Sequence, residues 1–279
     1  MPLDQSLPAR GVRRRGPLGT IRRLYLGHES MLLPLATFVI FLAAWEVGAI
    51  VGALDSFFFS SPSAIVAAGI VEMQLPRFWN DVFVSSSEFF IGYFLAVAVA
   101  LPFGLLTGWF RRLHYWFDPW LSAFNATPRL ALLPLVILWV GLGLWSKIVI
   151  VFLGVFFPVA INTFQGVRTV NRDLIEVSKT FGASIFMRLR SVVMPATLPF
   201  ALVGMRVGIG RAVSGVIVAE FFTSQVGLGN MILRAGQRYE IDRLLFGALF
   251  ITLLALLAFR GLSLIERRLT AWRPRVGSA

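Results

Sequence analysis

The chain has 279 residues, 57% of them hydrophobic, and its 26 Lys and Arg residues outnumber its 14 Asp and Glu residues by 12. A water-soluble domain of this length cannot bury so much apolar surface, so the composition predicts an all-α membrane protein. The absence of Cys, the presence of only two His residues and the lack of a basic patch interleaved with aromatics exclude a disulfide framework, a Cys/His metal site and nucleic acid as a partner.

Residues 1–30 are rich in Arg, Gly and Pro, and we predict a cytoplasmic tail followed by a short interfacial helix, with no function assigned. The apolar run 31–54 is long enough to span a bilayer. It is too long for a cleaved signal peptide and contains Glu46, so we predict a retained first transmembrane helix.

Residues 55–87 are polar and contain few basic residues, which favours an external loop with an amphipathic helix at 63–73, capped by Ser63. The second span is predicted at 88–109. It contains Gly104 and Gly108, a spacing that lets another helix approach closely.

The third apolar region, 117–140, is interrupted by Pro119, Pro128 and Pro134. Such breaks are tolerated at membrane depth only where protein or a water-filled cavity satisfies the freed backbone groups. Asn125 and Arg129 stand between these prolines, so both are candidates for lining a pathway or a gate.

The second half of the chain contains three further predicted spans. A short external turn at 141–147 precedes the fourth span at 148–166. The fifth, 197–222, contains several charged residues, and a Gly-rich polar loop at 223–243 separates it from the last span at 244–264.

Charged side chains inside these spans are candidate functional groups because a charge near the bilayer centre costs about 2.5–3.5 kcal/mol on insertion scales. Arg129 either serves an inner gate or attracts an anion, or its side chain snorkels to the headgroups.

Arg211 is a pore candidate whose alternative is a bond to Asn or backbone carbonyls. Arg206, nearer the inner end of the fifth span, is placed to meet the 168–195 loop or the helices on the inner side. Glu220 either gates the pathway or pairs with a nearby arginine, namely Arg234 or Arg238. Glu46 and Glu88 are expected at the membrane interface.

Six spans place both termini on one side, and the basic residues indicate which side. The proposed inner segments carry 18 of the 26 Lys and Arg residues, and the outer segments carry five. The positive-inside rule therefore predicts cytoplasmic termini. The predicted organisation is a tail at 1–30, a six-span domain at 31–266 with a cytoplasmic loop at 168–195, and a tail at 267–279.

A charged, amphipathic segment follows the fourth span. Asn171 is a good N-cap residue, and Glu176 stands early in the helix, where the helix dipole favours a carboxylate. Leu174, Val177 and Phe181 recur at spacings of three and four, which predicts one apolar helix face.

Gly182 breaks this pattern, and Ser184 can cap a second short helix with Ile185 and Phe186 on its apolar side. Pro195 closes the unit. We predict two short helices that are joined at a glycine, lie flat against the membrane bundle and form a rigid knob for a soluble partner.

The spacing of Glu176, Gly182, Val192 and Pro195 resembles the EAA loop of binding-protein-dependent ABC importer permeases. Further segments between about residues 59 and 272 resemble the branch of this family that transports nitrate, taurine and aliphatic sulfonates. These segments are SSPS at 60–63, ATPRLA at 126–131, LPLVILWVGLG at 133–143, NTFQG at 162–166, and AE at 219–220 followed by GLG at 227–229.

The resemblance implies a type I ABC importer permease with six transmembrane helices, located in a bacterial cytoplasmic membrane. Its implied partners are a second permease copy, two copies of a cytoplasmic ABC ATPase and a periplasmic or lipid-anchored solute-binding protein. In that family the loop docks into a cleft on the ATPase, which makes Glu176, Val177, Phe181, Gly182 and Pro195 the implied coupling residues.

The chain contains no G-x-x-x-x-G-K-[ST] sequence, so we expect no cofactor in it and expect ATP and Mg to bind the partner ATPase. The solute is expected to be small and anionic, although thiamine-precursor transporters use a similar permease. A secondary transporter driven by an ion gradient is the main alternative of another class. It would require an intramembrane carboxylate, and the available glutamates stand near span ends. A membrane-embedded enzyme lacks a plausible set of catalytic residues.

Overall fold

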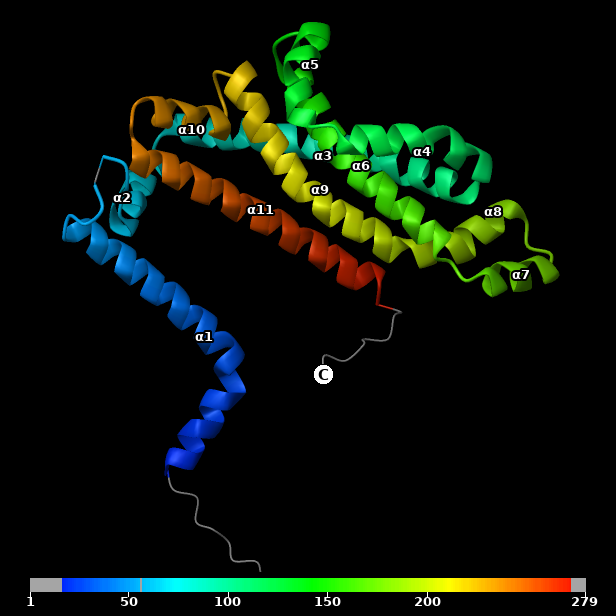
Figure 1. Cartoon of the computed structure of the whole chain (residues 1–279), viewed down its shortest axis with the longest axis horizontal. Coiled ribbons are helices and arrows are strands. Elements are labelled where there is room, and N and C mark those ends of the chain that lie inside the picture. The colour runs from blue at the N-terminus through cyan, green and yellow to red at the C-terminus, as the bar shows by residue number, and fades with distance from the viewer. Residues whose placement is uncertain (1–16, 56, 272–279) are drawn as a thin grey trace, which may run out of the picture. The chain divides into compact units, whose positions relative to one another are not determined.

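The computed structural model describes residues 17–55 and 57–271, and all regular elements among them are helices (Figure 1). The first six are α1 (Pro17–Ile50), α2 (Pro62–Met73), α3 (Pro76–Trp109), α4 (Arg111–Ala126), η1 (Arg129–Leu132) and α5 (Leu133–Val140). The remainder are α6 (Leu144–Arg168), α7 (Arg172–Thr180), α8 (Ile185–Arg188), η2 (Leu189–Val193), α9 (Met194–Thr223), α10 (Leu228–Gln237) and α11 (Ile241–Leu269). The chain divides into two compact units, one ending at Ser63 and the other beginning at Ala64.

The first unit consists mainly of α1. Residues 1–16 of the predicted tail lie outside the described residues, whereas 17–30 are continuous with the first apolar helix. The segment Leu32–Ile50 is long and apolar enough to cross a bilayer. Near its end the Glu46 carboxylate accepts hydrogen bonds from the N–H (3.0 Å) and the hydroxyl (2.6 Å) of Ser63.

Five helices in the described part of the chain are long and apolar enough to span a membrane, and a bent pair makes a sixth if it is counted as one span. The pair is α4 with Leu130–Val140, and its two halves meet at 87°. The bend follows Thr127, where Pro128 supplies no backbone N–H and disfavours helix in the residue before it. The predicted break in the third span is therefore confirmed. Helix α4 begins at Arg111, before the predicted start of the apolar region at 117.

The core of the second unit is formed by α3, α6 and α9, with α6 packed against both of the others. Close approach depends on glycine at two places on α3. A Cβ at Gly104 would lie 2.6 Å from the carbonyl oxygen of Ala160, and one at Gly108 would lie 2.6 Å from Cβ of Val167. The predicted role of this glycine pair in helix packing is thus confirmed.

Two helices begin earlier in the structure than the sequence predicted. Helix α3 begins at Pro76, twelve residues before the predicted start of the second span at 88, so much of the expected external loop is helical. Its first turns carry polar residues that lower the hydropathy but are buried in the fold, including Asp81, Ser85 and Glu88. Lys147, expected in a turn, lies in α6, which begins at Leu144.

The expected polar loop at 223–243 contains α10, whose Leu228 and Met231 are buried. Neighbouring glycines concealed this amphipathic helix in the sequence. Pro195 does not close the preceding unit, because α8 continues through a turn of π-helix, η2, directly into α9. Proline is accommodated in the first turn of α9, after the wider π turn has changed the hydrogen-bond pattern.

Candidate functional site

The segment between α6 and α9, residues 168–195, is here named the α7–α8 loop. Asn171 caps α7 by accepting a hydrogen bond from the N–H of Asp173 at 2.8 Å. Ser184 caps α8 in the same way, accepting from the N–H of Met187 at 3.2 Å. Both predicted caps are confirmed, and they fix where each short helix begins.

Helix α7 ends in a Schellman motif. The Ala183 N–H donates to the Ser178 carbonyl at 3.0 Å, and the Gly182 N–H donates to the Lys179 carbonyl at 2.9 Å. The motif requires a left-handed residue, which Gly182 supplies with φ of 73°. No atom lies within 4 Å of a Cβ built at Gly182. Glycine is therefore required at this position by backbone conformation and not by lack of space.

The α7–α8 loop exposes an apolar surface. Phe181 is 86% exposed, and Leu174 and Val177 are each more than half exposed. Ile185 and Phe186 on α8 are also exposed. The predicted apolar face of α7 thus exists, but it faces away from the bundle. Apolar side chains gathered on a surface in this way are typical of a docking site for another protein.

The loop is anchored to the bundle from its other side. Ile175 packs against a buried cluster formed by Val167, Val170 and Val193. This cluster includes residues of α6, of η2 and of the turn before α7, so the loop is attached to the ends of two core helices. Among the predicted coupling residues, Glu176, Val177, Phe181 and Gly182 stand together on or next to α7, whereas Pro195 lies in α9.

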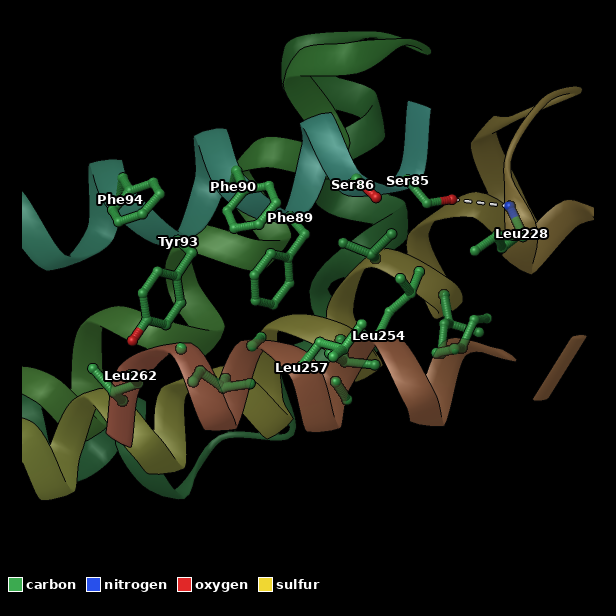
Figure 2. Close-up of a pocket in the computed structure, with 18 of the residues that line it drawn as sticks. Ser85, Ser86, Phe89, Phe90, Tyr93, Phe94, Leu228, Leu254, Leu257 and Leu262 are labelled. Carbon is green, nitrogen blue, oxygen red and sulfur yellow. Dashed lines mark hydrogen bonds between the residues drawn. The ribbon is translucent and has the colours of Figure 1, made fainter. Parts of the chain in front are cut away.

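A second polar site surrounds the N-terminus of α10, and we call it the α10 clamp. Its three side chains are Asp81, Ser85 and Glu220. Asp81 accepts from the N–H of Gly227 at 2.7 Å, the Ser85 hydroxyl oxygen accepts from the N–H of Leu228 at 2.9 Å, and Glu220 accepts from the N–H of Gly229 at 2.6 Å. Figure 2 shows the bond between Leu228 and Ser85.

The clamp satisfies backbone donors that a helix N-terminus leaves free, and its carboxylates lie at the positive end of the α10 dipole. Glu220 also accepts a hydrogen bond from the Ser85 hydroxyl at 2.6 Å, which connects α3 to α9. A Cβ at Gly229 would lie 2.8 Å from a carboxylate oxygen of Glu220. Glycine at this position therefore lets the backbone approach the acid closely.

The predicted pairing of Glu220 with Arg234 or Arg238 is wrong. Glu220 is fully buried and its oxygens are occupied by Ser85 and Gly229. Arg234 lies 4.0 Å from Asp81, and Arg238 lies 3.9 Å from Glu240. Long arginine side chains near the surface remain solvated, whereas the buried carboxylate is satisfied by local backbone N–H groups.

Glu88 was expected at the membrane interface, and this is also wrong. Its side chain is 1% exposed and forms an ion pair with Lys147 of α6. Lys147 also donates to the Ser224 hydroxyl at 3.2 Å. Two opposite charges can occupy a buried position together because each compensates the other.

Sequence reasoning missed Asp81, Ser85 and Lys147 as members of a common site. One signal was present, since positions 81, 85 and 88 follow helical spacing and place polar residues on one face of α3. Their partners come from α6, α9 and α10, and no local pattern indicates that pairing.

The remaining candidate residues lie at separate positions. Asn125 is exposed on α4, and Arg129 begins η1, with its side chain outside the description. Arg206 pairs with Glu266 of α11 at 2.5 Å and not with the 168–195 loop, which was one of its two expected partners. Arg211 is half-buried in α9.

An apolar cavity of about 470 Å³ lies between α3, α9, α10 and α11 (Figure 2). Figure 2 shows Phe89, Tyr93 and Leu254 among the side chains around it. The hydroxyl of Tyr93 donates to the carbonyl of Met205 at 3.0 Å. The lining is almost wholly apolar, so the cavity offers no set of polar groups for recognising a charged solute.

Multiple apolar spans, a broken third span and an exposed loop between the fourth and fifth spans define a multi-pass membrane protein of the transport class. The model of the binding-protein-dependent transport system inner membrane component family matches residues 100–271. The chain belongs to this family of ABC importer permease subunits.

Two bacterial relatives illustrate the match. The chain is 32% identical over 252 residues to the protein named aliphatic sulfonates transport permease protein SsuC of Bacillus subtilis, covering 90% of each sequence. It is 29% identical over 279 residues to the taurine transport system permease protein TauC of Escherichia coli, covering 98% of each.

A solved structure of the MetNI methionine ABC transporter in an inward-facing conformation contains a chain of the same fold. The TM-score is 0.59 at 21% identity, with 68% of this chain and 94% of the other covered. The predicted type I importer permease fold is thus confirmed.

Proposed function

We propose that this permease subunit carries a small anionic solute, of the sulfonate, taurine or nitrate kind, across a bacterial cytoplasmic membrane. A cytoplasmic ABC ATPase would drive the cycle by gripping the α7–α8 loop. The observation that carries the proposal is the exposed apolar surface of that loop, led by Phe181, in a chain of the importer permease family. Names of the two relatives support an anionic solute.

The structure of the loop suits the transmission of movement. Its caps and the Schellman motif at Gly182 hold α7 and α8 in a fixed relation. Ile175 and the cluster under it tie the loop to α6 and η2. A displacement applied to Val177 and Phe181 would therefore move the ends of the core helices rather than be absorbed within a flexible segment. Glu176 lies exposed beside this surface and supplies a charge at its edge.

The distribution of basic residues supports a topology with both termini in the cytoplasm. One of the five basic residues in the outer segments, Lys147, is buried against Glu88 and is therefore not an exposed charge. The count of 18 inner against five outer Lys and Arg residues supports this topology. The same topology puts the α7–α8 loop on the side where ATP is available.

We further propose an assembly of two copies of this chain, two ATPases that bind ATP and Mg, and an external solute-binding protein. The pathway would lie between the permease copies and be lined by Asn125 and Arg129 beside the broken span and by Arg211 in α9. Glu220 is assigned a structural role in the α10 clamp, since its oxygens are already occupied.

The proposal is tested by purifying the tagged chain from native membranes and identifying the ATPase that accompanies it. Phe181→Ser should reduce ATPase recovery about tenfold or more, because large apolar side chains at the centre of an interface contribute most of its binding energy. The matched control is Phe222→Ser. Phe222 is also exposed but lies near the C-terminal end of α9, far along the chain from the α7–α8 loop, so this substitution should leave ATPase recovery unchanged. Undiminished recovery with Phe181→Ser would contradict the proposal, as would uphill solute accumulation by the chain reconstituted alone.

A further inference from the structure

Helix α9 has two faces of different chemistry. One contributes Met205, Ile209 and Val213 to the apolar cavity. Another exposes residues 203, 207, 210 and 214, which recur at helical spacing and are Val, Val, Gly and Ser. Arg211 lies at the edge of this second face, which we call the Arg211 face. A Cβ at Gly210 would meet no atom within 4 Å, so the space around Gly210, the residue before Arg211, is open in the single chain.

Within the described part of the chain, Arg211 differs from the other charged residues of α9, Arg206 and Glu220, in leaving a buried side-chain atom without a hydrogen-bond partner. Arg206 is neutralised by Glu266 at 2.5 Å, and Glu220 is held in the α10 clamp. One terminal nitrogen of Arg211, Nη1, is buried and has no hydrogen-bond partner within residues 17–55 and 57–271, and Arg211 makes no ion pair there either. A buried guanidinium nitrogen without an acceptor is costly.

Arg211 lies in the interior of α9, far from both ends of the helix. It stands twelve residues before Thr223 and 17 residues after Met194, so roughly 18 Å and 26 Å of helix separate it from the two ends. These distances are much longer than an arginine side chain. In lipid the charge would cost about 2.5–3.5 kcal/mol, so the Arg211 face is expected to meet water or protein in the assembled transporter.

We propose that Arg211 binds the oxyanion group of the transported solute as it passes along the Arg211 face. The inference rests on the proposed function and adds the residue that recognises the charge of the cargo. A guanidinium offers paired N–H donors that match a sulfonate or carboxylate, or the planar nitrate ion. Val207, Gly210 and Ser214 beside it are small or of moderate size, which leaves room for a solute of a few atoms.

The absence of cysteine in the chain makes a direct test possible, because one introduced thiol is the only one. Ser214→Cys places a thiol one helical turn from Arg211 with little change of shape. The assembled transporter in membrane vesicles is treated with two methanethiosulfonate reagents of similar size, one carrying a sulfonate and one carrying a trimethylammonium group. The ratio of the two reaction rates reports the local preference for an anion.

The ratio of sulfonate to trimethylammonium reaction rates is expected to fall about fivefold or more when Arg211→Gln is added, and to be retained with Arg211→Lys. Thr252→Cys on α11 is the matched control. Thr252 is exposed and, like Ser214, donates its hydroxyl to the carbonyl four residues earlier. At that position the rate ratio should not depend on residue 211. If the Arg211→Gln variant is not produced in the membrane, a protection experiment replaces it. With Arg211 in place, ethanesulfonate should slow the modification of Ser214→Cys, and tetramethylammonium should not.

Three results would overturn the inference. The first is a rate ratio that is the same with Arg and with Gln at position 211, together with no protection of Ser214→Cys by ethanesulfonate. The second is that neither reagent reacts with Ser214→Cys, which would place the Arg211 face against lipid or packed protein. The third is that the trimethylammonium reagent reacts faster with Arg211 present, which would indicate that an acidic side chain of a second copy is already paired with Arg211. If ATPase recovery still depends on Phe181, such results refute the Arg211 assignment alone. Loss of that dependence refutes the proposed function itself.

Discussion

Two short helical segments connect the last three spans, and they are held in opposite ways. The α7–α8 loop caps its own helices with Asn171 and Ser184 and leaves its apolar side chains exposed. Helix α10 is capped by side chains from elsewhere in the fold, the Asp81, Ser85 and Glu220 of the α10 clamp, and buries its apolar side chains. The first segment is thus free to engage another protein, whereas the second is fixed to its own bundle.

The largest expected effect comes from breaking the buried ion pair next to the clamp. Lys147→Met leaves the Glu88 carboxylate buried without compensation, so the free energy of unfolding should fall by about 3–5 kcal/mol. Denaturant titration of the purified protein, followed by tryptophan fluorescence, measures this change. The double variant Lys147→Met with Glu88→Leu should recover most of the loss, and a double variant no more stable than Lys147→Met would contradict the assignment.

Removing the clamp acid should have the next largest effect. Glu220→Ala leaves the Ser85 hydroxyl and the Gly229 N–H without their acceptor in a buried site, so we expect a loss of about 2–4 kcal/mol. Hydrogen exchange should increase selectively in α10. The control is Glu240→Ala, whose carboxylate is partly exposed and which should change stability by less than about 1 kcal/mol. Equal effects of the two variants would contradict the clamp.

In the α7–α8 loop the backbone conformation of Gly182 should affect coupling more than the space around the residue does. Gly182→Val should cost about 1–2 kcal/mol locally, because a β-branched residue cannot easily adopt φ of 73°, and should uncouple ATP hydrolysis from uptake. Gly182→Asn should retain coupling, since asparagine tolerates this conformation. Both are measured as uptake per ATP hydrolysed in proteoliposomes.

Gly52 offers a control for this effect, because it also has positive φ and open space around a Cβ. Gly52→Val imposes the same backbone strain outside the loop. It should leave the ratio of uptake to hydrolysis unchanged, and normal coupling in Gly182→Val would refute the role given to the loop.

The smallest effect on stability is expected for the exposed apolar side chains of the loop. Phe186→Ser should change the free energy of unfolding by no more than about 0.5 kcal/mol, because the side chain is already solvent-exposed in the isolated chain. Its effect should instead be weaker stimulation of the ATPase by the permease. A large loss of stability without loss of stimulation would reverse the contrast drawn between the two segments.

Local sequence patterns predicted the α7–α8 loop well, because caps, the glycine at the end of α7 and the apolar spacing all act within a few residues. The break at Pro128 was predictable for the same reason. The α10 clamp was not, since Asp81 and Gly227 are 146 residues apart and meet only in the folded chain. Hydropathy also misplaced the start of α3, because its polar residues find buried partners that no sequence window contains. The motif AE at 219–220 and GLG at 227–229 was noticed as a resemblance, yet only the structure joins its two parts as an acid and the backbone that it caps.

The π-helical turn η2 between α8 and α9 has a geometric consequence of its own. A π turn contains about one residue more than an α turn, and each residue of an α-helix corresponds to about 100° of rotation. Conversion of Leu189–Val193 to regular α geometry would therefore turn α8 relative to α9 around the axis of α9 by about that angle. A single-residue change of register would in this way reorient the exposed apolar side chains Ile185 and Phe186 of α8 while α9 itself stayed intact.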